Sequence, residues 1–370
     1  MRGGPGQLLA GRYRLTDRPE PFRAHAVDER TGESVLLRAL ELPALLTAGQ
    51  DPEEEAPAQA DRLVRRVAAV GSAAPAAHPR LLRGVGAFVD GESLWTAEER
   101  PAGQTAAELL VGGPVPPYRA AELAADLAGA LRALHAAGLT HGNVTAESVL
   151  VCEDGAAMLG GLLAGVAQEA LAEELGGPGG RRRYDVRATL VGPVAERWPL
   201  DGGPAGDCWA LGVLVHRLVT GRAPYPEGGV PELVTAVRDG RREHSAVCGP
   251  LGPLVERLLQ PDPVLRPTAE TVWRELAELL AGAPEPVDEE RVARAVTLKP
   301  EAPLVPVRKR RGGRRGGNSG DTGNAGGAGK RSGGDAKPPR IPPALLGPLL
   351  VGGVFVLLAL GMAAVVMFAG

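Results

Sequence analysis

The sequence predicts an α+β fold in which short strands precede a larger set of helices. Residues 11–42 alternate short β-type segments with the turn dipeptide Thr31-Gly32, a pattern typical of hairpins. Within residues 120–136, leucines recur at helical spacing, which predicts a buried helix. These leucines are Leu123, Leu127, Leu131 and Leu134. The 370 residues allow a domain of roughly 250 to 280 residues, with one large core or two lobes, plus further segments.

The net charge of -3 at pH 7 conceals a strong asymmetry along the chain. Residues 308–340 hold ten Lys or Arg residues against Asp321 and Asp335, a local charge of +8. Residues 341–370 carry no charge, so residues 1–307 have a net charge of -11. We therefore treat the basic interval separately from the folded part.

The three cysteines are scattered and form no CxxC pair. This pattern indicates neither a zinc site nor a disulfide framework, and it fits a reducing compartment. We expect Cys152 and Cys208 to be small core residues. No charged and apolar leader opens the sequence, so a secretory signal is not expected.

The most specific motifs lie in the second half of the chain. Residues 207–212 read DCWALG and residues 218–225 read LVTGRAPY, and residues 259–268, LQPDPVLRPT, follow later. In this order the runs resemble the large-lobe signatures of bacterial Ser/Thr protein kinases. The resemblance covers about residues 10–281 and implies a two-lobed α+β fold, with a small lobe at about 10–100 and a large lobe at about 101–281.

The resemblance implies structural roles for four residues. His141 belongs to the catalytic loop, and Asp207 would brace the backbone of that loop. Glu196 closes a run that resembles Ala-Pro-Glu with the proline lost, and it would pair with Arg266. A buried pair of this kind is costly to break because one charge is then left unpaired.

Residues 134–165 resemble the catalytic-loop region of the family, but the chemical groups are absent. Asn143 takes the place of the catalytic Asp, Thr145 of the Lys, and Ser148 of the Mg-binding Asn. Gly161 takes the place of the Asp that binds metal in Asp-Phe-Gly. Phosphoryl transfer depends on neutralising charge around phosphate oxygens, which these residues do not supply. We therefore expect no metal site.

The nucleotide-binding motifs of the small lobe are also altered. No glycine occurs between Gly11 and Gly32, where the family has a Gly-rich loop, and Pro19 and Pro21 lie there instead. Arg38 takes the place of the strand Lys. Its planar guanidinium is a poor substitute at a close phosphate site, so we expect Arg38 to be mainly structural.

Residues 51–55 are expected to form an acidic loop and residues 61–70 the helix of the small lobe. In the family this helix offers a Glu to the strand Lys. Here Arg65 and Arg66 are nearest, which predicts a repulsion with Arg38. Residues 95–98, ending at Glu98, correspond to the inter-lobe hinge, where backbone groups meet adenine; the sequence therefore leaves open ATP binding without Mg.

The interval 176–187 corresponds to the activation segment, and Thr189 follows it. Four basic residues lie upstream: Arg181, Arg182, Arg183 and Arg187. A phosphate added to Thr189 by an active kinase could pair with these arginines and order the segment. The alternative is that Thr189 is an ordinary residue that is never modified.

The last part of the chain is predicted to contain a linker and a membrane anchor. Residues 282–340 are rich in Pro, Gly, Ser, Lys and Arg, a composition typical of disordered linkers. Residues 344–369 are predicted to form a transmembrane helix, because 349–369 gives 21 residues without charge. The basic flank then predicts a single-pass protein with its N-terminal domain in the cytoplasm, and residues 308–340 on anionic lipid of the inner leaflet.

The sequence thus predicts a membrane-tethered cytoplasmic pseudokinase, a binding, scaffold or regulatory protein in Ser/Thr kinase signalling. The expected partner is a protein, with an active Ser/Thr kinase as one candidate, and no nucleic acid. The alternative is an active or weakly active ATP-dependent Ser/Thr protein kinase that uses unusual catalytic residues.

Overall fold

The computed structural model describes residues 4–17, 23–42, 52–73, 78–177, 180–200 and 202–283. Three predictions therefore fall outside the described residues: the prolines at 19 and 21, the linker from residue 284 onward, and the membrane span at 344–369. Within the described part, no helix is both long enough and apolar enough to cross a bilayer. The elements described below all belong to one compact unit.

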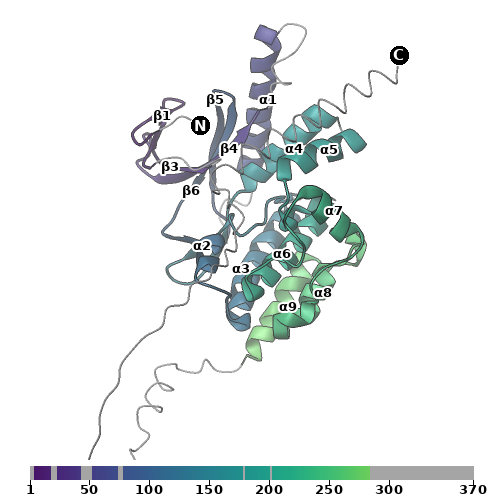
Figure 1. Cartoon of the computed structure of the whole chain (residues 1–370). Coiled ribbons are helices and arrows are strands. Elements are labelled where there is room, and N and C mark those ends of the chain that lie inside the picture. The colour runs from purple at the N-terminus through teal and green to yellow at the C-terminus, as the bar shows by residue number, and fades with distance from the viewer. Residues whose placement is uncertain are drawn as a thin grey trace, which may run out of the picture. The chain divides into compact units, whose positions relative to one another are not determined.

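The small lobe is built on a six-stranded antiparallel sheet with the order β1-β2-β3-β4-β6-β5 (Figure 1). Its strands are β1 Leu8–Leu9, β2 Tyr13–Leu15, β3 Arg23–Asp28, β4 Ser34–Glu41, β5 Gly84–Asp90 and β6 Ser93–Glu99. The predicted hairpin at residues 31–32 joins β3 to β4, and Gly32 has φ +73°, which a glycine adopts without strain. Tyr13, Phe88 and Trp95 stack in the core of the sheet, with ring centroids 5.0 and 6.3 Å apart.

Helix α1, Pro52–Ala73, is longer than the sequence predicted. The expectation of a loop at 51–55 is wrong for residues 52–55, which form the first turn of α1. Acidic residues are favourable at a helix N-terminus because they complement the helix dipole, which explains why this run is helical. Leu63 and Val67 of α1 are buried in a cluster with Leu94 of β6.

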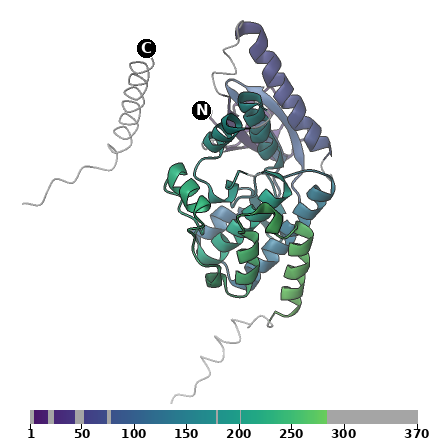
Figure 2. The same cartoon turned by 90° about the vertical axis from the view of Figure 1, so that its right-hand side faces the viewer.

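The large lobe is mainly helical, and a small sheet, β7 Gly103–Thr105, β8 Val149–Cys152 and β9 Ala157–Leu159, lies beside its helices. Helix α3, Pro117–Ala136, contains the predicted helix at 120–136, and its four leucines are completely buried. The other helices of this lobe are α2 Ala106–Val111, α6 Gly203–Thr220, α7 Val230–Arg238, α8 Gly252–Leu258 and α9 Ala269–Ala281 (Figures 1 and 2). Short 3-10 turns are η2 Ala195–Arg197, η3 Ser245–Leu251 and η4 Pro263–Leu265. Cys208 and Cys248 are buried in the core, and all three cysteines are free.

One helix precedes the predicted activation segment, residues 176–187, and a second lies largely within it. Helix α4, Leu162–Gly176, begins directly after Gly161, and α5 is Arg181–Val191. One side of α4 buries Leu163, Ala167 and Leu171 in the same cluster as Leu63, Val67 and Leu94. Helix α4 therefore supplies core residues to the small lobe.

Candidate functional site

Asp207 of α6 holds the backbone of the loop that corresponds to the catalytic loop. Its carboxylate accepts hydrogen bonds from the backbone N–H groups of His141 and Gly142, each at 2.8 Å. The Nε2 atom of His135 lies 2.9 Å from the same carboxylate. Asp207 is only 2% exposed, so these contacts are shielded from water and fix the loop firmly.

His141 is completely buried beneath this loop. Its Nδ1 accepts the backbone N–H of Asn143 at 3.2 Å, and its Nε2 has no hydrogen-bond partner. Burial lowers the pKa of His141 to about 4, because a charged imidazole would lose its hydration, and Asp207 opposes this only in part. The ring is therefore neutral at physiological pH.

Asn143, at the position of the catalytic base, serves as a structural link. Its Nδ2 donates to the carbonyl oxygen of Gly161 at 3.2 Å, and its Oδ1 accepts from Nη2 of Arg197 at 2.7 Å. Both ends of the amide are thus engaged. A carboxamide has no basic lone pair comparable to that of a carboxylate, so this side chain cannot take a proton from a substrate hydroxyl.

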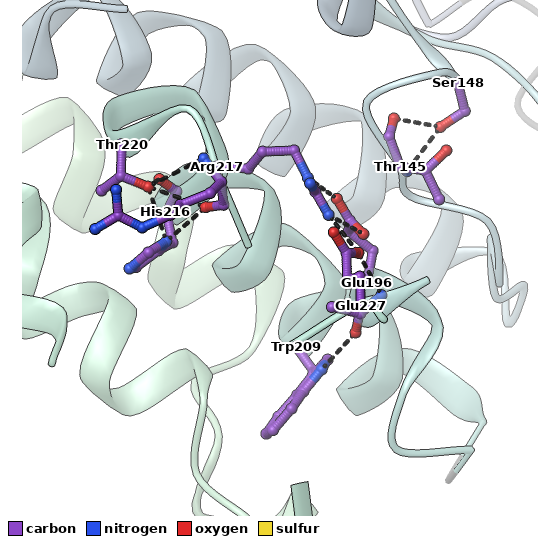
Figure 3. Close-up of polar contacts among 10 residues, drawn as sticks. Thr145, Ser148, Glu196, Trp209, His216, Arg217, Thr220 and Glu227 are labelled. Atoms are coloured by element: carbon purple, nitrogen blue, oxygen red, sulfur yellow. Dashed lines mark hydrogen bonds and ion pairs between the residues drawn. The ribbon is translucent and has the colours of Figure 1, made fainter. Parts of the chain in front are cut away.

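Gly161, at the position of the metal-binding Asp, has no room for a side chain. Its φ of +82° lies in the left-handed region, and a Cβ added there would lie 2.6 Å from Nδ2 of Asn143 and 3.3 Å from Cβ of Ser148. The Ser148 hydroxyl is engaged as well, because it accepts from the backbone N–H of Thr145 and donates to its carbonyl oxygen, both at 2.9 Å (Figure 3). No group of three metal-ligating side chains occurs among the described residues. The residues present at this site do not fit a magnesium ion.

The cation of β4 pairs with a carboxylate from β6. Arg38 Nε donates to Oε1 of Glu98 at 3.1 Å, and Oε2 of Glu98 accepts the backbone N–H of Gly161 at 2.5 Å. In the register Leu36 lies opposite Glu98 and Arg38 opposite Thr96, so Arg38 and Glu98 are diagonal neighbours on one face of the sheet. Long side chains reach across such diagonals.

This pairing corrects two predictions. The expected repulsion with Arg38 is wrong, because Arg66 of α1 pairs with Glu173 of α4 at 2.5 Å. Residues 95–98 do not form a hinge, because they lie within β6 and are paired with both β4 and β5. Glu98 instead directs its buried carboxylate toward Gly161.

The cleft in front of this pair is closed in the described part of the chain. It holds about 20 Å³ between Leu36, Leu82 and Leu150, whereas pockets for small organic ligands measure roughly 300 to 1,000 Å³. Arg23 of β3 crosses the cleft and contacts Glu108 at 3.2 Å and Glu147 at 3.1 Å. The described residues therefore leave no space for an adenine ring.

Glu196 takes part in an ion pair, but its partner differs from the expected one. Its carboxylate accepts from Nε and Nη2 of Arg217 at 2.7 and 3.1 Å, and Nη2 also contacts Glu227 at 2.6 Å (Figure 3). The predicted pairing of Glu196 with Arg266 is wrong. Arg266 donates to carbonyl oxygens, and its guanidinium lies 4.9 Å from the ring centroid of Trp209. These carbonyl groups belong to Ala205, Gln260 and Pro261.

Thr189 lies on the exposed side of α5, where its hydroxyl donates to the carbonyl oxygen of Asp185 at 3.0 Å. Two of the upstream arginines are engaged by acids of α4. Arg183 contacts Glu169 and Glu173, and Arg187 lies 3.1 Å from Glu169. Arg181 lies 3.8 Å from Asp185 on its own helix. A phosphate on Thr189 would therefore compete with carboxylates for these arginines.

Sequence reasoning missed Arg197, which contacts Asn143 from η2. The only sequence signal was its position next to Glu196, and its approach to the catalytic loop depends on tertiary packing. It also missed the side chain of Glu98, since the hinge assignment used only backbone groups. Both residues lie at the centre of the site.

The fold and the arrangement of the site define the class of protein. No protein-family model matches the chain. The kinase domain of PknI from Mycobacterium tuberculosis superposes with a TM-score of 0.53 at 17% identity, covering 76% of this chain and all of that domain. The described residues therefore form a two-lobed, protein-kinase-like α+β fold.

Curated relatives agree with this class. Serine/threonine-protein kinase PkaA of Streptomyces coelicolor is 30% identical over 287 residues, which cover 76% of this chain and 49% of PkaA. Serine/threonine-protein kinase PknL of Mycobacterium tuberculosis is 31% identical over 144 residues, 37% of this chain and 33% of PknL. The chain spans about half the length of PkaA. These similarities support a kinase-like family related to Ser/Thr protein kinase signalling.

Proposed function

We propose that this chain is a pseudokinase that acts by binding in Ser/Thr kinase signalling rather than by transferring phosphate. One observation carries the proposal: the space where a metal-binding carboxylate would begin at Gly161 is filled by the amide of Asn143. Gly161, at the position of the metal ligand, and Asn143, at the position of the base, therefore pack against each other.

Two further contacts and one cleft volume support the absence of phosphate transfer. Arg38 is held by Glu98, the Ser148 hydroxyl is held by Thr145, and the adenine cleft measures about 20 Å³. Each of these removes a separate contribution to nucleotide binding or charge neutralisation. Our proposal includes no bound ATP or magnesium.

The decisive experiment measures phosphate transfer by the full-length chain. With labelled ATP and Mg²⁺, we expect no incorporation into the chain or a generic protein substrate. The alternative, an active kinase with unusual catalytic residues, predicts metal-dependent incorporation that disappears in Asn143→Ala and Arg38→Ala chains. It should persist in Arg242→Gln, a control at an arginine that pairs with Glu256. That result would refute the proposal.

Nucleotide binding is tested separately by thermal unfolding. A ligand at 100 times its Kd adds about 2.7 kcal/mol of stability. We expect ATP at millimolar concentration to leave the melting temperature unchanged, with or without Mg²⁺. A shift that requires no metal would mean that the cleft opens around nucleotide while remaining catalytically inert.

We further propose that residues 344–369 anchor the chain in the cytoplasmic membrane and that residues 308–340 lie on anionic lipid. The support is compositional: no charge in the apolar run and a local +8 before it. An epitope added after Gly370 should be accessible to protease from outside intact cells. Its protection, with digestion of the kinase-like domain, would reverse the topology.

The expected partner is a protein, with an active Ser/Thr kinase as a candidate that could also modify Thr189. The exposed position of Thr189 on α5 supports access by another kinase. Mass spectrometry of the protein from its native cells tests the modification. Unmodified Thr189 under all growth conditions would remove this switch, and a Thr189→Ala chain that captures the same partners would show that the site does not control binding.

A further inference from the structure

A cavity of about 680 Å³ lies between β4, the catalytic-loop segment, α4 and α5. Its volume is within the range of small-molecule sites, roughly 300 to 1,000 Å³. Its apolar lining comes from Leu40, Leu42, Ala164 and Leu190, and its polar lining from Arg38, Asn143, Gln168, Thr189 and Arg197. Apolar walls with a few convergent polar groups are typical of ligand pockets.

Arg197 is the most unusual group in this cavity. Its Nη2 donates to Asn143, but its Nε is shielded from water and has no hydrogen-bond partner. No described carboxylate lies within ion-pair distance of it, because the adjacent Glu196 is engaged by Arg217. The pKa of Arg197 is lowered to about 10, mainly because burial disfavours the charged form; the nearby charge of Glu196 opposes this shift and that of Arg38 adds to it. A largely buried cation that forms no ion pair with a described carboxylate is costly unless an anion completes the site.

Arg38 adds a second guanidinium to the same cavity. Its side chain is 14% exposed, and Glu98 is its only carboxylate partner among the described residues. Of the two cations at this end of the cavity, Arg38 is paired with Glu98, and Arg197 forms no ion pair with a described carboxylate. Glu41 also lines the cavity, but its side chain is exposed. The inner end of the cavity thus has an excess of positive charge.

We propose that this cavity binds a small phosphorylated molecule without a metal ion, with the phosphate between Arg38 and Arg197. The body of the ligand lies along Leu40, Leu42 and Leu190. Guanidinium groups suit this role because their planar forks match phosphate oxygens and they remain charged. The site adjoins the closed adenine cleft, and Arg38 lines both, but the other lining residues of the two differ. It requires no catalysis by this chain, so it can be tested whether or not phosphate transfer occurs.

The test is calorimetric titration of the full-length chain, in EDTA, with inorganic phosphate and with phenyl phosphate. Both should bind, and phenyl phosphate should bind more tightly because its ring buries apolar surface against the leucines. Arg197→Gln should weaken both by about 10-fold or more, since hydrogen bonds to charged groups contribute roughly 1.5 to 3 kcal/mol. Arg242→Gln is the control: the Arg242 side chain is 14% exposed, like that of Arg38, it pairs with Glu256, and it does not line the cavity.

A second variant keeps both guanidiniums and fills the cavity instead. Ala164→Met places a longer side chain into the space from α4 at a position suited to either residue in a helix. It should abolish binding of phenyl phosphate while the tryptophan fluorescence melt stays close to that of the parent chain. This variant decides the question if Arg197→Gln does not fold.

Three results would overturn the proposed site. These are the absence of binding by both phosphate probes, equal affinity of the chain for the two probes, and probe affinities that are the same in Arg197→Gln or Ala164→Met as in the parent chain. Binding of ATP with Mg²⁺ but not of phenyl phosphate would also overturn it, because the ligand would then be a metal nucleotide.

Discussion

Replacing Gly161 by Ala should destabilise the chain because the new Cβ has nowhere to go. The φ of +82° costs a non-glycine residue about 1 to 2 kcal/mol. The Cβ would lie 2.6 Å from Nδ2 of Asn143, and overpacking of this kind costs about 1 to 3 kcal/mol more. The total of about 2 to 5 kcal/mol corresponds to a fall in melting temperature of roughly 5 to 15 °C for a domain of this size.

Gly142 provides a matched control for this measurement. Its φ is +68°, and nothing lies within 4 Å of an added Cβ, so Gly142→Ala carries only the backbone cost. Thermal melts of the full-length chain, followed by tryptophan fluorescence, compare the two variants. In an Asn143→Ala background, which removes the obstructing amide, Gly161→Ala should cost little more than Gly142→Ala. Equal losses for the two single variants would refute the packing argument.

Three further predictions concern charge. The free energy of unfolding should fall as the pH drops from about 6.5 to 4, because the imidazole of His141 takes up a proton in the unfolded chain at a higher pH than in the folded chain. The contribution of His141 to stability, about 3 kcal/mol, is complete above pH 6.5 and is lost by pH 4. Urea titrations should show a shallower loss in His141→Gln, and an unchanged slope would contradict the assignment. Glu98→Leu should lower the free energy of unfolding by about 3 to 5 kcal/mol, because it leaves Arg38 unpaired. In thermal melts, the double variant Arg38→Met/Glu98→Leu should recover most of this stability; no recovery would mean that loss of the ion pair is not the cause. A peptide of residues 308–340 should bind vesicles that contain anionic lipid, with a binding free energy of about 1 kcal/mol per Lys or Arg near the surface, and it should dissociate in high salt. Equal binding to neutral vesicles would exclude the electrostatic account.

Local patterns in the sequence predicted much of the scaffold. The leucine spacing gave α3, and the turn dipeptide at 31–32 gave the β3–β4 hairpin, because both signals depend on neighbouring residues alone. Helices α4 and α5 were missed for a different reason. Residues 162–176 are rich in Ala, Leu and Glu, which strongly favour a helix. The resemblance directed the interpretation to Gly161 and to residues 176–187 on either side, and no helix was assigned to this interval.

The site could be predicted only in part, because its contacts join distant segments. Sequence motifs located Asn143, Ser148 and Gly161 as positions where catalytic groups are absent. They could not show what fills those positions, since the Arg38–Glu98 pair depends on the register of two strands about 60 residues apart. The partner of Glu196 was also set by tertiary packing, which brings Arg217 rather than Arg266 to its carboxylate.

The close fit of α4 against the catalytic-loop segment limits which side chains the positions around residue 161 can accept. A Cβ on Gly165 would overlap the carbonyl oxygen of His141, and one on Gly160 would lie 2.6 Å from Leu82. Glycines on both sides of residue 161 thus depend on the present helix position. An acid placed at residue 161 alone would therefore disturb the core, and accommodating it would require coordinated substitutions at the neighbouring positions. The packing of α4 by itself thus favours glycine at these positions, whatever the activity of the chain.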